Sequence, residues 1–211
     1  MIRKFWSNHP IVLELMVFAA LAAALMIGCD KKASKGSKEI SMGPKKIKLE
    51  TNMGDIVIEL NEEAAPVTVK NFLRYVEEDF FDGTIFHRVI PDFMIQGGGF
   101  TADMERKETH EPIVNEAGNG SKNKRSTIAM ARTNNPNSAT SQFFINLKDN
   151  DFLNYAEQRN PGYAVFGKVV KGMDAVDAIA AVKTSRKGQY SDVPVEPVVI
   201  KSAKTISSKQ D

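Results

Sequence analysis

Cysteine, histidine and tryptophan are scarce in this chain of 211 residues, which holds one cysteine, three histidines and one tryptophan. A single cysteine, Cys29, excludes an internal disulfide framework and any metal site built from several thiolates. His9 lies in the N-terminal segment, so only His87 and His110 remain, too few for a histidine-rich metal centre. The sequence therefore predicts no metal site.

Several signatures of catalysis and cofactor binding are also missing. The run Gly97–Gly99 lacks the Gly-Lys-Ser/Thr ending of a phosphate-binding loop and the strand-to-helix context of a dinucleotide site. No Gly-x-Ser-x-Gly elbow occurs. The net charge is only +2, so nothing in the charge balance requires a nucleic-acid partner. What remains is a site that works through shape and hydrogen bonding.

The first 28 residues have the order of a targeting segment. Arg3 and Lys4 are followed by an apolar run over residues 11–27 and then by Cys29. This order predicts a signal peptide over residues 1–28, and its end resembles a bacterial lipobox, whose cysteine carries the lipid. The alternative is an uncleaved transmembrane anchor, since the run approaches the length needed to cross a bilayer. In either case we expect a membrane-anchored protein on the periplasmic side of the cell envelope.

Residues 29–46 are rich in lysine, serine and glycine and contain almost no apolar side chains. Such a segment predicts a flexible polar linker with a reach of about 20–25 Å. The folded domain is expected over residues 47–205, followed by a frayed tail over 206–211. Nothing in the sequence indicates more than a monomer.

Short apolar stretches dominate the expected domain. Residues 47–51 and 55–60 alternate apolar and polar and predict a β-hairpin. Helical spacing of apolar residues predicts amphipathic helices within 61–78 and 173–180, and residues 184–196 are expected to form a polar loop. Further strands are expected at 84–90, 93–97, 127–132, 142–147, 163–170 and 198–202. Many short strands without a βαβ rhythm predict a mainly β fold, an antiparallel sheet closed into a barrel with helices at its ends.

The stretch Phe86–Phe100 is chemically the most unusual part of the chain. It places Arg88 and Gln96 among aromatic and sulfur-bearing side chains and ends in three glycines. An arginine in such surroundings is either a paired structural charge or a donor positioned toward a pocket. We expect the second.

Four motifs resemble the cyclophilin-type peptidyl-prolyl isomerases. They are Phe86–Gly98, Met130–Arg132, Ser141–Ile145 and Val165–Gly167, and they occur in family order. The resemblance spans residues 47–205. It implies a cyclophilin-like fold, a closed eight-stranded antiparallel β-barrel capped by two α-helices. It also implies a surface groove for proline-containing polypeptide clients and no cofactor.

The resemblance also implies the site residues. Arg88, Gln96 and Phe93 would be catalytic. The substrate-binding residues would be Met94, Ala131, Arg132, Gln142, Phe144, Phe152, Leu153 and Tyr163. His87 is more simply a structural hydrogen-bonding residue, because the reaction needs no general base.

The chemistry of prolyl isomerisation explains these residue types. An X–Pro bond rotates in tens to hundreds of seconds because rotation breaks amide resonance. Reaching milliseconds requires about 5.5–7 kcal/mol off the barrier. Apolar side chains can hold the proline ring while Arg88 donates toward the prolyl nitrogen, which is basic only in the twisted state. Gln96 can orient Arg88 and touch the substrate carbonyl.

Two positions depart from the eukaryotic pattern. Phe152 stands where cyclosporin-sensitive members carry tryptophan, and Tyr163 where they carry histidine. The chain thus resembles the bacterial branch, and without the indole N–H we expect weak cyclosporin binding. The predicted function is a prolyl isomerase that assists protein folding outside the cytoplasm. The alternative is a non-catalytic peptide-binding chaperone or scaffold of the cell envelope.

Overall fold

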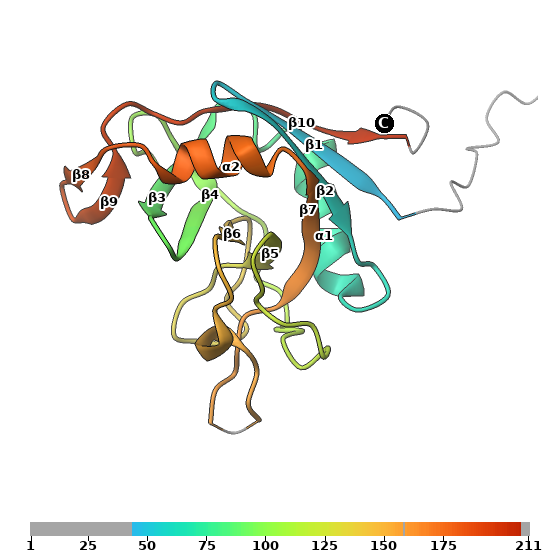
Figure 1. Ribbon diagram of the computed structural model, residues 1–211. Coiled ribbons are helices and arrows are strands. Elements are labelled where there is room, and N and C mark those ends of the chain that lie inside the picture. Colours follow the sequence, from blue (N-terminus) through green and yellow to red (C-terminus); the bar gives the residue numbers. More distant parts are fainter. Residues whose placement is uncertain (1–43, 158, 208–211) are drawn as a thin grey trace, which may run out of the picture. The chain divides into compact units, whose positions relative to one another are not determined.

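The computed structural model describes residues 44–157 and 159–207 (Figure 1). The predicted signal peptide, Cys29 and most of the predicted linker lie outside the described residues. Within the described part of the chain, no helix is long and apolar enough to cross a membrane.

Eight strands form one antiparallel sheet in the order β10-β1-β2-β7-β5-β6-β4-β3. Strands that follow each other in the sequence often pair directly. The predicted hairpin is an example: β1 pairs with β2 in a register that runs from Lys46 opposite Glu59 to Thr51 opposite Gly54. The strands are β1 (Lys46–Thr51), β2 (Gly54–Leu60), β3 (Thr84–Ile90), β4 (Met94–Thr101), β5 (Thr127–Met130), β6 (Phe143–Asn146), β7 (Val165–Lys171) and β10 (Ile200–Ile206).

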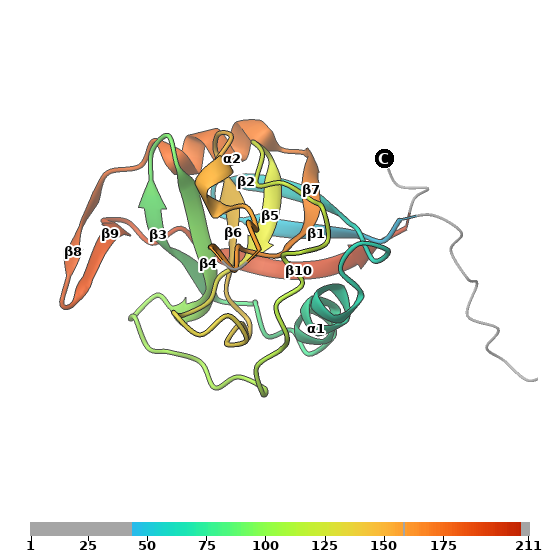
Figure 2. The ribbon, with the colours of Figure 1, turned by 90° about the horizontal axis from the view of Figure 1, so that it is seen from below.

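Two α-helices flank the sheet on opposite sides (Figure 2). Helix α1 (Pro66–Glu77) begins with proline in its first turn, where the missing N–H costs no hydrogen bond, and buries Val69, Phe72 and Val76. Glu62 and Glu63, within the range expected for this helix, lie before its start. Helix α2 (Met173–Ala180) follows Gly172, whose φ of 87° is a conformation that glycine tolerates best.

The expected polar loop over residues 184–196 instead contains a second, two-stranded sheet. Strands β8 (Thr184–Lys187) and β9 (Tyr190–Pro194) form a hairpin whose turn includes Gly188 at a φ of 61°. The sequence did not predict this hairpin, because most of the hairpin's side chains are polar and exposed and only Val193 and Pro194 are buried. The hairpin extends to one side of the domain (Figure 1).

The closed barrel expected from the sequence is not observed. The curled sheet ends at β10 and β3, which do not pair as strands. One isolated bridge, Ile85–Val199, joins β3 to the chain leading into β10. Two backbone hydrogen bonds of 2.9 Å flank it, from Gly83 N–H to the carbonyl of Ile200 and from Phe86 N–H to the carbonyl of Val198. Pro197 and Val199 turn their backbone groups toward Asn52 instead: Asn52 Nδ2 donates to the carbonyl of Pro197 at 3.0 Å, and Val199 N–H donates to Oδ1 of Asn52 at 2.9 Å. The fold is a curled eight-stranded half-barrel with two helices.

The main core lies inside the curl, between the sheet and the helices. Phe72 of α1 is in ring contact with Phe81, Phe143 and Phe166, at centroid distances of 5.1, 5.6 and 5.1 Å. All four rings are at most 1% exposed. Phe143 and Phe166 thus fill the core, and the neighbouring Phe144 and Val165 face the other side of their strands.

Candidate functional site

The candidate site is a row of residues across five strands. The register pairs Arg88 of β3 with Gln96 of β4 and Gln96 with Phe144 of β6. Phe144 in turn pairs with Ala129 of β5, and Ala129 with Val165 of β7. Because side chains alternate between the faces of a sheet, these partners share one face, opposite to the core-facing set.

A small pocket opens on this face. Met94, Phe144 and Leu153 form its buried apolar part, in a cluster separate from the main core. The cavity is about 110 Å³, far smaller than a cavity for a drug-sized ligand and suited to one compact side chain. Its lining is Arg88, Phe93, Met94, Gln96, Ala131, Arg132, Phe144, Leu153 and Tyr163.

The structure thus brings together nine of the predicted site residues around one cavity. Two others lie beside it. Phe152 is 65% exposed and stacks on Phe93 with ring centroids 5.6 Å apart, and Gln142 lies behind Gln96. Cys29, the predicted lipidation site, is outside the described residues.

Arg88 is the charged group at the edge of the apolar pocket. Its side chain is 42% exposed, and its Nε lies 3.9 Å from Oδ2 of Asp192 on β9. This contact approaches the guanidinium through Nε, which leaves the terminal nitrogens to donate elsewhere. The expected orientation of Arg88 by a hydrogen bond from Gln96 is not observed.

Gln96 is instead held by Gln142. Its Nε2 donates to Oε1 of Gln142 at 3.0 Å. Gly99 makes this arrangement possible, because a Cβ at that position would lie 2.5 Å from Cγ of Gln142. The glycine after the motif Gln96–Gly98 therefore leaves room for the side chain that fixes Gln96.

Tyr163 and Arg132 form the opposite side of the pocket. The Tyr163 ring meets Phe144 edge-on at 5.6 Å, and the Arg132 guanidinium lies over the Tyr163 ring at 4.3 Å. Arg132 also donates through Nε to the carbonyl of Gly162 at 2.9 Å and through a terminal nitrogen to Thr133 at 2.8 Å. These contacts fix a cation beside the pocket before any client binds.

Buried asparagines connect the pocket walls from behind. Asn150 donates through Nδ2 to the carbonyl of Phe93 at 2.9 Å and to Oδ1 of Asn146 at 2.8 Å. Asn146 donates to Oδ1 of Asn123 at 3.2 Å, and Asn123 donates to the carbonyl of Leu153 at 3.2 Å. Asn123, Asn146 and Asn150 are all 0% exposed. Two walls of the pocket are therefore joined by one chain of amides.

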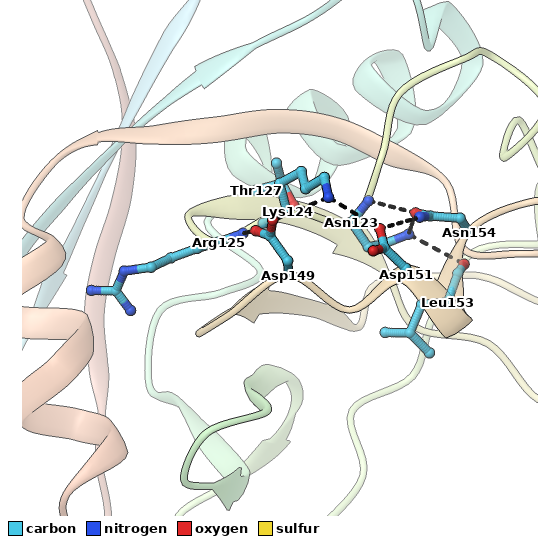
Figure 3. Close-up of polar contacts among 8 residues, drawn as sticks. All are labelled: Asn123, Lys124, Arg125, Thr127, Asp149, Asp151, Leu153 and Asn154. Atoms are coloured by element: carbon cyan, nitrogen blue, oxygen red, sulfur yellow. Dashed lines mark hydrogen bonds and ion pairs between the residues drawn. The ribbon is translucent and has the colours of Figure 1, made fainter.

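The short 3-10 helix η1 (Asp151–Leu153) carries Leu153 and is fastened from outside as well (Figure 3). The N–H of Asn123 donates to Oδ1 of Asn154 at 2.7 Å. Lys124 pairs with Asp149 at 3.0 Å and with Asp151 at 3.1 Å. The N–H of Arg125 and then Lys124 hold the pKa of Asp149 below its ordinary value.

His87 lies next to Arg88 but is buried, with its ring 4.6 Å from that of Phe100. Burial first, and then the nearby charge of Arg88, lower the pKa of His87 to about 4. Its Nδ1 has no hydrogen-bond partner among the described residues. A neutral buried ring fits the expected structural role, although the expected hydrogen bond is not seen at this nitrogen.

Together these contacts can hold an apolar ring and present hydrogen-bond donors at its edge. No nucleophile or base is positioned for covalent chemistry in the lining of the pocket. The sequence interpretation missed Asp192 and the asparagine chain. The Asp192 hairpin lacked an apolar pattern, whereas the close spacing of Asn146, Asn150 and Asn154 was a readable signal.

The chain matches the family model described as "Cyclophilin type peptidyl-prolyl cis-trans isomerase/CLD" over residues 46–205. It is 60% identical to the peptidyl-prolyl cis-trans isomerase cyp18 of Streptomyces antibioticus over 162 residues, which cover 76% of this chain and 98% of that protein. It is 59% identical to peptidyl-prolyl cis-trans isomerase B of Escherichia coli over 154 residues, which cover 72% and 94% of the two chains.

Among solved structures, a cyclophilin-type isomerase of Cryptosporidium parvum is similar, with a TM-score of 0.65 and 27% identity. The match covers 78% of this chain and 99% of that chain.

Proposed function

Since the chain belongs to the cyclophilin-type peptidyl-prolyl cis-trans isomerases and is an enzyme of that class, we propose that it assists the folding of proteins outside the cytoplasm. Its clients are proline-containing polypeptides in unfolded or extended form. The observation that supports proline-containing clients is the apolar cavity bounded by Met94, Phe144 and Leu153, with Arg88 at its edge.

The arrangement accounts for catalysis without a covalent step. The cavity holds the proline ring while the preceding part of the client rotates. A terminal nitrogen of Arg88 donates to the prolyl nitrogen, whose lone pair is free only in the twisted state. Because this bond is stronger in the transition state than in either planar isomer, it lowers the barrier rather than merely tightening binding.

A proline-limited refolding assay with the full chain in mild detergent tests the activity. We expect the wild type to accelerate the slow phase, and Arg88→Ala to lose at least about ten-fold in kcat/KM, equal to 1.4 kcal/mol of transition-state stabilisation. Arg74→Ala, an exposed arginine paired with Glu78 on α1, is the matched control and should retain the activity. An Arg88→Ala variant as active as the wild type would contradict the mechanism.

We further propose that residues 1–28 are a signal peptide and that a lipid on Cys29 holds the domain at the periplasmic face of a membrane. The basic start, the apolar run and the position of the single cysteine support this proposal. The mass of the mature N-terminus tests it.

A further inference from the structure

A second, larger hollow adjoins the proline pocket. We call it the hairpin pocket; its volume is about 540 Å³, and it lies between strands β3 and β4 on one side and residues 189–192 of the β8–β9 hairpin on the other. It shares Arg88, Gln96 and Arg132 with the proline pocket. A client held in the smaller cavity therefore has part of its chain at the edge of the larger one.

Positive charge predominates in the hairpin pocket. Arg88, Arg106 and Arg132 line it together with one carboxylate, that of Asp192. His87, which also lines it, adds no charge at neutral pH, because burial lowers its pKa to about 4. The ionised side chains thus leave an excess of two positive charges in a hollow next to the catalytic site.

Two of the arginines, Arg106 and Arg132, have no carboxylate partner among the described residues, so their charges can pair with an incoming anion. Arg106 is exposed and forms no ion pair with any residue that the structure describes. Arg132 is fixed by Gly162, Thr133 and the Tyr163 ring, contacts that leave its charge without a carboxylate partner in the described chain. A fixed guanidinium loses little conformational entropy when it binds a carboxylate.

The polarity of the client chain follows from the proposed mechanism. Arg88 faces the prolyl nitrogen, and that nitrogen is bonded to the residue that precedes the proline. The preceding residues therefore leave the proline pocket on the Arg88 side, toward the hairpin pocket. At about 3.3 Å per extended residue, the first two of them pass along its edge.

We propose that the hairpin pocket is a client subsite that selects acidic side chains one or two positions before the proline, with Arg106 and Arg132 as the binding cations. This inference rests on the proposed function, whose site it extends. It assigns to Arg106 a role in specificity and none in bond rotation. Asp192 repels the same carboxylate and so limits the preference.

A peptide series tests the subsite with the full chain in mild detergent. The peptides carry Glu, Gln or Lys at each of the two positions before a single proline, and kcat/KM is measured for each. For exposed opposite charges we expect Glu to exceed Gln by about two- to five-fold at low salt and Lys to fall below Gln. The preference should shrink at 0.5 M salt, where charges are screened within about 4 Å.

Variants assign the preference to residues. Arg106→Gln should lower the Glu-to-Gln ratio of kcat/KM toward one. Arg106→Lys should retain most of the preference. Arg186→Gln is the matched control, because Arg186 lies on the β8–β9 hairpin that borders the pocket, is exposed, and does not line the pocket. Asp192→Asn should raise the ratio.

Equal rates for the Glu and Gln peptides in the wild type would overturn the proposal, as would a ratio unaffected by Arg106→Gln. A charge preference found only after the proline would overturn the assigned direction. Calorimetric binding of the same peptides separates the subsite from the catalytic function. Tighter binding of Glu peptides without any isomerisation would support the subsite and reject the proposed function.

Discussion

At the scale of single residues, the titration of His87 makes the stability of the folded domain depend on pH. Its folded-state pKa of about 4 lies below the ordinary value of 6.5, chiefly because the ring is buried. Between these values the unfolded chain binds a proton that the folded chain does not. The contribution of His87 to stability is therefore complete above about pH 6.5 and is lost as the pH falls toward 4.

We accordingly expect the free energy of unfolding to fall by up to about 3 kcal/mol through His87 between pH 6.5 and pH 4. The measurement is urea denaturation across that range, for the wild type and for His87→Gln, which cannot titrate. Carboxylates with lowered pKa values, such as Glu50 and Glu78, also contribute near the acid end, but they are common to both proteins. Parallel pH profiles for the two proteins would refute the assignment.

The apolar surroundings indicated Arg88 and the family resemblance indicated Gln96, but neither showed which residues hold these side chains in place. A special role for Arg88 was predictable, because a cation among apolar residues is either paired with an opposite charge or positioned as a donor toward a pocket. Its contact with Asp192 bridges more than a hundred positions of sequence, and no local pattern shows such a pairing. The Gln96–Gln142 bond has the same origin, since it depends on a strand register that the sequence does not state.

At the scale of elements, the asparagine chain behind the pocket is the support with the largest expected effect. Asn150 satisfies the carbonyl of Phe93 and the side chain of Asn146 in a place without solvent. Asn150→Ala removes both donors and leaves a buried carbonyl oxygen of Asn146 without that partner, which costs about 1–3 kcal/mol.

We expect Asn150→Ala to lower the free energy of unfolding, measured by urea denaturation, by that amount. It should also reduce kcat/KM several-fold even where the variant is fully folded, because Phe93 and Leu153 lose their common support. Lys124→Ala is the matched control. It removes only exposed ion pairs to Asp149 and Asp151 on the same segment and should change stability by less than about 1 kcal/mol. Equal effects of the two variants would show that the amide chain has no special role.

Most elements were predictable because an element with one buried face has apolar residues at regular spacing in the sequence. The alternation in β1 and β2 and the helical stripe of Val69, Phe72 and Val76 gave their types correctly. The β8–β9 hairpin was missed since its strands are mostly exposed and carry no such period. The closure of the sheet was predicted wrongly, because it depends on pairing between β3 and β10, strands far apart in the sequence whose relation only the tertiary arrangement reveals.

At the scale of the whole molecule, the proposed location makes one further prediction. If the segment ending at Gly28 is removed and Cys29 is lipidated, the mature protein should lack those 28 residues and carry the added mass of a lipid at its N-terminus. Intact-mass spectrometry of the membrane fraction measures both, and Cys29→Ser should abolish the lipid. Recovery of an unmodified Cys29 with Met1 retained would mean an uncleaved anchor instead.

The pairing of β1 with β10 places Lys46 opposite Ile206, so the two ends of the folded domain are neighbours in the same ladder. Because the two ends are neighbours, the same fold could be formed by a chain that begins and ends at a different loop. A short glycine-rich connection between these ends would allow the chain to be opened elsewhere, for example at the exposed Gly188 of the β8–β9 turn. The domain is thus a natural candidate for circular permutation, with its row of site residues preserved because none of those strands would be cut.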